Sequence, residues 1–146
     1  MTKSIKAILI EGPIDPEKIK KSIAAHQPKT QIGAHSIFLG QVREDEIDGK
    51  KVAAIEYSGQ HEMINSIAHE IKESLFEQFD ITCAHVYHSM GRVAVGEICF
   101  FVFVSSGHRR AVFEALPYFV DELKAKLPVF GKELFEDNTH QWKVNT

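Results

Sequence analysis

Residues that could carry chemistry gather in the C-terminal part of the chain. The segment from Ser105 to Arg110 lies where an apolar, strand-like run passes into an amphipathic one. Backbone N–H groups at the start of a helix, with arginine beside them, suit a phosphate or a carboxylate. The segment therefore predicts an anion-binding site, with His108 and Arg109 as candidate ligands. The alternative is that Arg109 and Arg110 are solvated surface charges, as such pairs usually are.

A second group of cations lies further along the chain. Lys124, Lys126 and Lys132 crowd the end of the amphipathic run and the segment after Pro128. An amine among other cations is suited to donating or accepting a proton. Lysines at a helix C-terminus also suit the helix dipole, so a structural role is the alternative. Gly40-Gln41-Val42-Arg43 adds one more cation at the end of a predicted buried strand, where loops commonly carry sites.

The segment between the two groups is predicted to be a helix. Leu116, Val120, Leu123 and Leu127 form one apolar stripe at helical spacing. At about 1.5 Å of rise per residue, such a helix holds its ends roughly 24 Å apart. A small substrate cannot readily contact both ends, so a site that uses both groups needs a second copy of the chain. The spacing predicts a homodimer with shared anion-binding sites.

The other elements predict the scaffold that positions these residues. An N-cap aspartate followed by proline predicts a helix over 15–25. A longer helix is predicted over 62–79, with a buried face made of Met63, Ile67, Ile71, Leu75 and Phe79. Apolar runs predict strands over 5–10, 34–42, 52–57, 81–88 and 97–105. A polar loop is expected over 26–32, a charged turn over 44–51, a connection over 91–96 and an irregular or weakly β segment over 130–146.

The mixture of elements predicts the fold class. Helices and strands occur without strict alternation, which indicates an α+β protein with a mixed, largely antiparallel sheet. A chain of 146 residues is long enough for one domain with a real core, so a single domain over 1–146 is expected. Of the residues, 44% are hydrophobic and 25% charged, as in an ordinary soluble protein.

Composition also argues against several classes of function. The formal net charge of −3 argues against a general nucleic-acid binder, which is usually basic. The sequence has neither a membrane-length apolar stretch nor a secretory signal, so a cytoplasmic protein is expected. Cys83 and Cys99 form no CxxC pair and are interpreted as reduced, buried thiols.

Metal and nucleophile motifs are weak. His61-Glu62 and His69-Glu70 begin a zinc-protease pattern, but the second histidine of that pattern is missing in both. His85 and His88 are three apart in a predicted strand and face opposite sides. The sequence has no GxSxG motif and no glycine-rich phosphate loop. No metal site and no cofactor are therefore expected.

Several short motifs resemble those of one family in order and spacing. They are Gly40-Gln41-Val42-Arg43, Glu56-Tyr57, Glu62-Met63, His88-Ser89-Met90-Gly91, Val95-Gly96-Glu97, Ser105 to Arg109, Phe113-Glu114-Ala115 and Lys124-Ala125-Lys126-Leu127-Pro128. Each motif alone is weak, but their succession from about residue 33 to the C-terminus is specific. On these motifs the chain resembles the family of the large, catalytic subunit of molybdopterin synthase.

This resemblance implies a fold, a reaction and partners. The family fold is an α/β-hammerhead. Its members are sulfurtransferases that convert cyclic pyranopterin monophosphate into molybdopterin by installing two sulfurs as a dithiolene. The sulfur arrives as a thiocarboxylate on the C-terminal glycine of a small ubiquitin-like subunit, whose tail inserts into the large subunit. A homodimer of large subunits carries one small subunit at each end, so a heterotetramer is expected.

The resemblance also implies roles for individual residues. Arg43, His108 and Arg109 would bind the phosphate and the pterin, and Gln41 and Val42 belong to the same predicted binding site. A pocket with residues from both large subunits is implied, which agrees with the spacing of the two cationic groups.

The predicted catalytic residues are Lys124 and Lys132. Lys124 matches the family's essential lysine, whereas Gly131 stands where the family has its second active-site lysine. Lys132, one residue later, could reach the pocket from a flexible glycine loop, or the role could be missing. Gly131, Lys132 and Glu133 are included in the predicted binding site. The alternative function is a non-catalytic dimeric module that binds an anionic metabolite or a partner's C-terminal tail.

Overall fold

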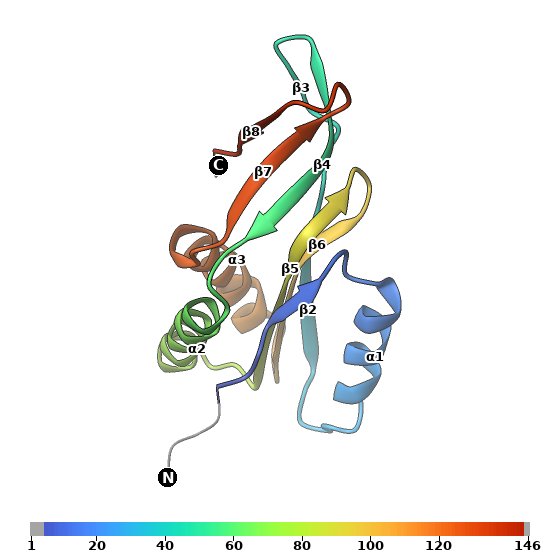
Figure 1. Ribbon diagram of the computed structural model, residues 1–146. Helices are drawn as coiled ribbons and strands as arrows, with labels where there is room; N and C mark the ends of the chain where they lie inside the picture. The colour runs from blue at the N-terminus through green and yellow to red at the C-terminus, as the bar shows by residue number, and fades with distance from the viewer. Residues whose placement is uncertain (1–4, 145–146) are drawn as a thin grey trace.

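The chain folds around one eight-stranded sheet with helices on both faces. Figure 1 shows the computed structural model, which describes residues 5–144. The strands are β1 (Leu9–Glu11), β2 (Ala34–Gln41), β3 (Glu46–Ile47), β4 (Lys50–Ser58), β5 (Cys83–Ala94), β6 (Ile98–Ser106), β7 (Phe130–Phe135) and β8 (His140–Trp142). The helices are α1 (Pro16–His26), α2 (His61–Gln78) and α3 (Arg109–Lys126). The predicted α+β class is confirmed.

The sheet is mixed and largely antiparallel, as predicted. Its strand order is β2-β6-β5-β4-β7-β8, while β1 pairs with β5 and β3 pairs with β4. The β1–β5 pairing is parallel and the other pairings are antiparallel. The predicted strand over 5–10 is wrong for residues 5–8, which precede β1, and β1 extends one residue further, to Glu11. Residues 145 and 146 of the predicted weakly β segment lie outside the described residues.

Strand β5 joins the two parts of the sheet. Its first half, Cys83 to His88, pairs with β6, and its last residues, Gly91 to Ala94, pair with β4. Gly91 has φ +79°, a conformation that glycine adopts without steric cost, at the point where the strand changes partner. The predicted connection over 91–96 is therefore wrong for residues 91–94, which continue the strand.

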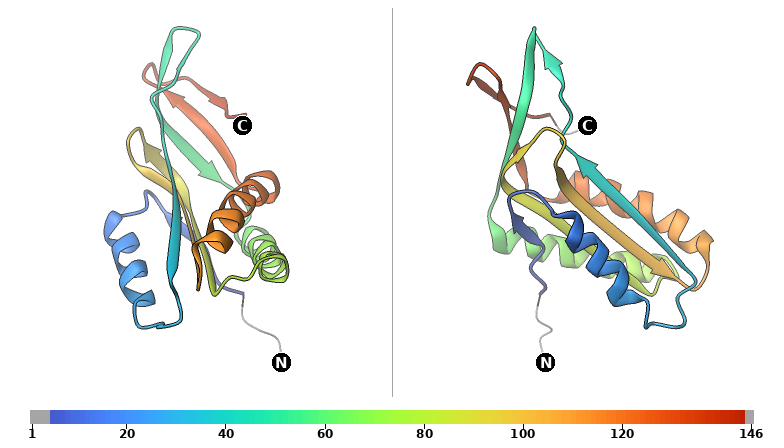
Figure 2. Two further views of the ribbon diagram at one scale, coloured as in Figure 1. Left: turned by 180° about the vertical axis from the view of Figure 1, so that it is seen from behind. Right: turned by 90° about the vertical axis from the view of Figure 1, so that its right-hand side faces the viewer.

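Helices cover the two faces of the sheet unequally. Figure 2 shows α2 and α3 together on one face, with α1 alone on the other. Alternate residues of β6 point to the two sides. Val102 and Val104 pack in the larger core with Val112 of α3, while Phe101 and Phe103 form a smaller core with Ile14.

Local sequence explains how the helices begin. The Asp15 side chain accepts a hydrogen bond from the Glu17 N–H at 2.9 Å, and Pro16 occupies the first helical position, as predicted for α1. Helix α1 extends one residue further than predicted and includes His26. In α2 the buried residues are Ile64, Ala68, Ile71 and Leu75, whereas Met63 is 53% exposed. The predicted buried face of α2 is thus wrong at its first position.

The charged turn over 44–51 is a β-hairpin. Asp48 and Gly49 both have positive φ, 52° and 78°, which is the geometry of a two-residue type I′ turn between β3 and β4. The segment after residue 130 forms β7 and β8, in agreement with the predicted weak β character. No helix within residues 5–144 is long and apolar enough to cross a membrane.

Candidate active site

A cavity of about 630 Å³ lies where the end of β2, the middle of β4, strand β7 and the last turn of α3 meet. Clefts of this size accommodate small organic ligands. Six residues of the predicted site line the cavity: Gln41, Val42, Arg43, Lys124, Gly131 and Glu133. The structure thus brings residues 41–43 together with residues of the segment 124–133, which lies far along the sequence.

The cavity has a neutral histidine in its wall. His88 Nδ1 lies 2.8 Å from the Ser89 carbonyl oxygen, so Nδ1 carries the proton and donates, and Nε2 keeps its lone pair. Burial lowers the pKa of His88 to about 4, and the Lys124 ammonium adds to this shift. At neutral pH the ring is therefore uncharged, and its Nε2 is able to accept a hydrogen bond.

This histidine gives the fold a pH-dependent stability. An unfolded histidine titrates near 6.5, while His88 in the fold titrates near 4, so the unfolded chain binds the proton first as the pH falls. The contribution of His88 to the free energy of unfolding is therefore fully present above about pH 6.5, and it is lost as the pH falls toward 4. Urea unfolding should show that the free energy of unfolding falls less between pH 7 and pH 4.5 for His88→Gln than for the parent. The difference between the two proteins should be up to roughly 3 kcal/mol. An equal loss in both proteins would contradict the assignment.

Two further groups in the cavity are held in their protonated forms. Burial raises the pKa of Tyr57 well above its ordinary value, and the nearby Cys99 and Glu133 add to the shift. Burial also raises the pKa of the Cys99 thiol, and the Lys124 and Lys143 ammonium groups offset this only in part. The sequence predicted only a reduced, buried thiol at Cys99, and in the structure this thiol lines the cavity. As a protonated thiol, it is a poor nucleophile.

Lys124, in the last turn of α3, lines this cavity, whereas its neighbour Lys126 does not. Lys126 Nζ instead lies 2.8 Å from the Glu122 carboxylate on the exposed side of the helix. Arg43 lies at the cavity rim, where its guanidinium is 3.4 Å from Asp45 and remains 73% exposed. The cavity is therefore lined by two of the predicted cations, Arg43 and Lys124, which lie far apart in the sequence.

The second predicted lysine lies elsewhere. Gly131 is part of β7 and pairs with Tyr57, so it does not belong to a flexible loop. Because side chains alternate along a strand, Lys132 lies on the face opposite to Gly131. Its amine is 3.6 Å from the Glu56 carboxylate and lies over the Trp142 ring, and Lys132 is not among the residues that line the cavity.

A lysine that sequence reasoning missed lines the cavity beside Gly131. Lys143 follows β8, and its backbone N–H donates to the Gly131 carbonyl at 2.8 Å. A Cβ atom built on Gly131 would lie 3.6 Å from the Lys143 Cβ. No sequence signal identifies this neighbour, because the contact depends on the β7–β8 register.

His108 and Arg109 lie at the opposite end of α3, as their spacing predicted. His108 is the N-cap residue of α3, and both residues line a separate hollow of about 280 Å³ with Arg110, Phe113 and Glu114. Arg109 and Lys124 are about 22 Å apart along the axis, at about 1.5 Å per residue. One chain therefore does not bring these two groups into one cavity.

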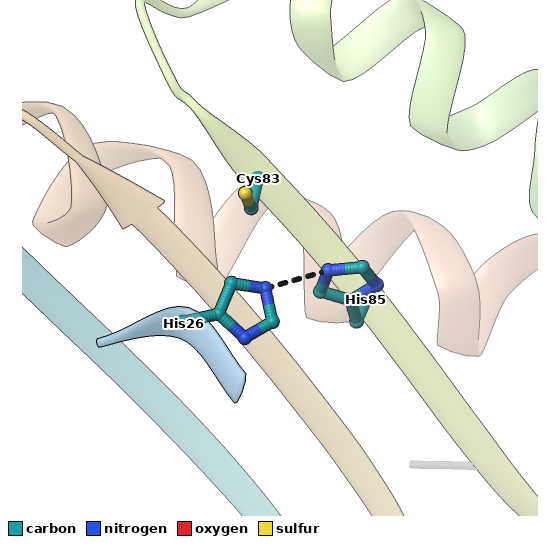
Figure 3. A group of neighbouring side chains, drawn as sticks. All are labelled: His26, Cys83 and His85. Carbon is teal, nitrogen blue, oxygen red and sulfur yellow. Dashed lines mark hydrogen bonds between the residues drawn. The ribbon is translucent and has the colours of Figure 1, made fainter. Parts of the chain in front are cut away.

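A cluster of metal-ligand type lies on the other face of the sheet. Figure 3 shows His26 from the end of α1 facing Cys83 and His85, which are two residues apart on β5. One ligand atom from each lies within 4.8 Å of the others. Sequence reasoning missed this cluster because it paired His85 with His88 and left His26 in a loop.

The surroundings of this cluster oppose a metal cation. Ser22 O accepts from His26 Nδ1 at 2.7 Å, so His26 Nε2 is the acceptor for His85 Nε2 at 2.9 Å. Lys6 Nζ lies 3.5 Å from His85 Nδ1, and Lys29 Nζ lies 3.1 Å from the Cys83 sulfur. Two ammonium groups at such distances repel a cation. We therefore assign the cluster a structural role: it fastens the end of α1 to the sheet.

The fold and the cavity together define a class of protein. This is a mixed α+β domain with an anion-suited cavity at one end of a long helix and a separate cationic hollow at the other end. Comparison with known proteins places it more narrowly. The pattern of the family described as "MoaE protein" matches residues 9–126. The chain belongs to this family.

Relatives from distant organisms carry the same name. The chain is 37% identical over 113 residues to the molybdopterin synthase catalytic subunit of Rattus norvegicus, which covers 77% of the chain and 56% of the relative. It is 34% identical over 132 residues to that of Pyrococcus abyssi, which covers 90% of the chain and 87% of the relative. The chain thus spans little more than half the length of the mammalian relatives it matches.

Solved structures share the fold. Molybdopterin synthase from Staphylococcus aureus superposes with a TM-score of 0.82 at 25% identity, over 94% of this chain and 96% of that one. A complex of subunits 1 and 2 of molybdopterin-converting factor from Helicobacter pylori superposes with a TM-score of 0.78 at 18% identity, over 92% and 87%. The second likeness concerns the fold alone.

Proposed function

We propose that this chain is the catalytic subunit of a molybdopterin synthase. It would transfer two sulfurs from a thiocarboxylated, ubiquitin-like small subunit to cyclic pyranopterin monophosphate and so form the dithiolene of molybdopterin. The observation that carries the proposal is the position of Lys124 in the 630 Å³ cavity, at the end of α3 that lies away from His108 and Arg109. Family membership and the relatives' shared name support it.

The cavity chemistry suits two anionic reactants. Arg43 at the rim can bind a phosphate through charge-assisted hydrogen bonds, and the Lys124 amine inside can contact a thiocarboxylate. Each transfer forms a carbon–sulfur bond on the pterin side chain, and the oxygen that the sulfur displaces leaves that carbon with a proton. Water then breaks the acyl carbon–sulfur bond and supplies the new oxygen of the tail carboxylate. Neutral His88 can accept a hydrogen bond from a reactant, and Lys124 can donate a proton.

The active unit would be a dimer. Because α3 separates Arg109 from Lys124, we propose that the partner copy supplies His108 and Arg109 to each cavity. The dimer would carry one small subunit at each end, as a heterotetramer, and would act in the cytoplasm. Residues 1–146 would form one domain, which the continuous sheet supports.

The direct test is incubation of the purified chain with the thiocarboxylated small subunit and cyclic pyranopterin monophosphate, followed by assay for molybdopterin. We expect turnover that depends on the thiocarboxylate, with the carboxylate form of the small subunit as the control. Binding of both partners without molybdopterin formation would instead indicate the non-catalytic module that the sequence left open.

A further inference from the structure

We propose that Lys143 supplies the second lysine of the cavity, in the place of the lysine that the family resemblance expects at position 131. This inference rests on the proposed function and deepens it, because it adds a substrate-contacting residue to the same site. The ligand of Lys143 would be the anionic end of the partner's tail.

Backbone geometry carries the first step. Strands β7 and β8 pair with Lys132 opposite Trp142 and Glu133 opposite Gln141. The antiparallel register then places residue 143 opposite Gly131, and the 2.8 Å hydrogen bond from the Lys143 N–H to the Gly131 carbonyl fixes this pairing. Directly opposite residues on antiparallel strands present side chains on the same face. Lys143 therefore shares the face of Gly131.

Side-chain contacts give the second step. A Cβ on Gly131 would meet Tyr57 at 3.4 Å and Lys143 Cβ at 3.6 Å, so the Lys143 stem begins next to the place that a residue-131 side chain would fill. Tyr57, Gly131 and Lys143 all line the cavity. A lysine on either strand would enter the cavity from nearly the same point.

Charge gives a third, supporting step. The Lys124 and Lys143 ammonium groups both act on the Cys99 thiol, which lines the same cavity. Both lysines line the cavity, so both amines are available to an anionic group bound in it. The carboxylate of Glu133 is also in this wall, and it limits the repulsion between the two amines.

Lys132 does not meet these conditions. Its amine is engaged with Glu56 at 3.6 Å and lies over the Trp142 ring, and although Trp142 lines the cavity, Lys132 itself does not. Reaching the cavity would require this side chain to give up its ion pair with Glu56. Lys143 needs no such rearrangement.

The test compares four variants in the molybdopterin assay. The rate is measured over a range of concentrations of the small subunit, which gives kcat/KM for that subunit. We expect Lys143→Ala to lower kcat/KM for the small subunit about 10–100-fold, the range for a lost charged hydrogen bond. Lys143→Arg should retain most of this activity, because it keeps the cation. Lys126→Ala, a matched loss of an exposed lysine on α3, should equal the parent. Lys132→Ala is the competing variant.

A relocation variant makes the test specific. Adding Gly131→Lys to Lys143→Ala returns the amine to the family position and should restore at least part of the lost activity. Gly131→Ala in the parent measures the packing cost, since the new Cβ would lie 3.2 Å from Ile55 Cγ2. Thermal unfolding of every variant separates loss of fold from loss of function.

The outcomes distinguish this inference from the proposed function. A parent that makes no molybdopterin would reject the proposed function. An active parent whose Lys143→Ala variant is equally active would reject only the role of Lys143. A Lys132→Ala variant slowed by 10²–10⁴-fold, the effect of a lost acid–base group, with Lys143→Ala unaffected would assign the second lysine to Lys132 instead.

Discussion

Lys124→Ala should abolish sulfur transfer while leaving the fold intact. Lys124 reaches the cavity from the last turn of α3, and it lies close enough to His88 to contribute to that residue's lowered pKa. Its amine is the cation inside the cavity that both our sequence analysis and the structure identify. Loss of a proton donor costs roughly 10²–10⁴-fold, and loss of the contact to the thiocarboxylate adds to this.

The fold should tolerate this change, because the core face of α3 does not include Lys124. The buried residues of the helix are Val112, Ala115, Phe119, Val120 and Leu123, so removing the lysine opens no core void. We expect the melting temperature and the affinity for the small subunit to stay near the parental values. Lys126→Ala on the same turn is the matched control. Full activity of Lys124→Ala would overturn the mechanism proposed for this cavity.

Sequence periodicity predicted α3 well, since its length and cations follow from local pattern. The helix runs over Arg109–Lys126, it includes most of the predicted apolar stripe, and its ends carry the two cationic groups. Local spacing along one helix translates directly into distance. For that reason the separation of Arg109 from Lys124 could be predicted before any tertiary contact was known.

Strand pairing could not be predicted in the same way. The contact of Lys143 with Gly131 depends on the register of two short strands, and a shift of one residue would turn Lys143 to the other face. The face of Lys132 depends on the same register. Sequence order made Lys132 the obvious substitute for a missing lysine at 131, whereas strand alternation makes Lys143 the neighbour in space.

The role of Gly91 shows a second limit of local reading. Glycine near residues 91–96 is typical of a connection between strands. In the fold, β5 continues through Gly91 because a second partner, β4, pairs with it from Gly91 onward, after the pairing with β6 has stopped at His88. Tertiary pairing thus overrides the local turn signal, and it carries His88 to the edge of the cavity.

Mixing two inactive variants should restore activity if the cavity is shared between subunits. An Arg109→Ala chain lacks the group that it would donate to its partner, while a Lys124→Ala chain lacks the amine of its own cavity. In a heterodimer of these chains, one site carries both defects and the other is intact. With equal mixing and random exchange, about one quarter of the parental site activity should return.

The control for this experiment uses two defects in the same cavity. Arg43 and Lys124 line one cavity of one chain, so a mixture of Arg43→Ala and Lys124→Ala chains leaves one defect in every site. That mixture should show no recovery beyond the activity of the separate variants. Recovery in the first mixture and not in the second assigns His108 and Arg109 to the partner's cavity. If the first mixture shows no recovery although subunit exchange is demonstrated, Arg109 does not act in the partner's cavity. The two cationic groups of α3 then do not serve one shared site.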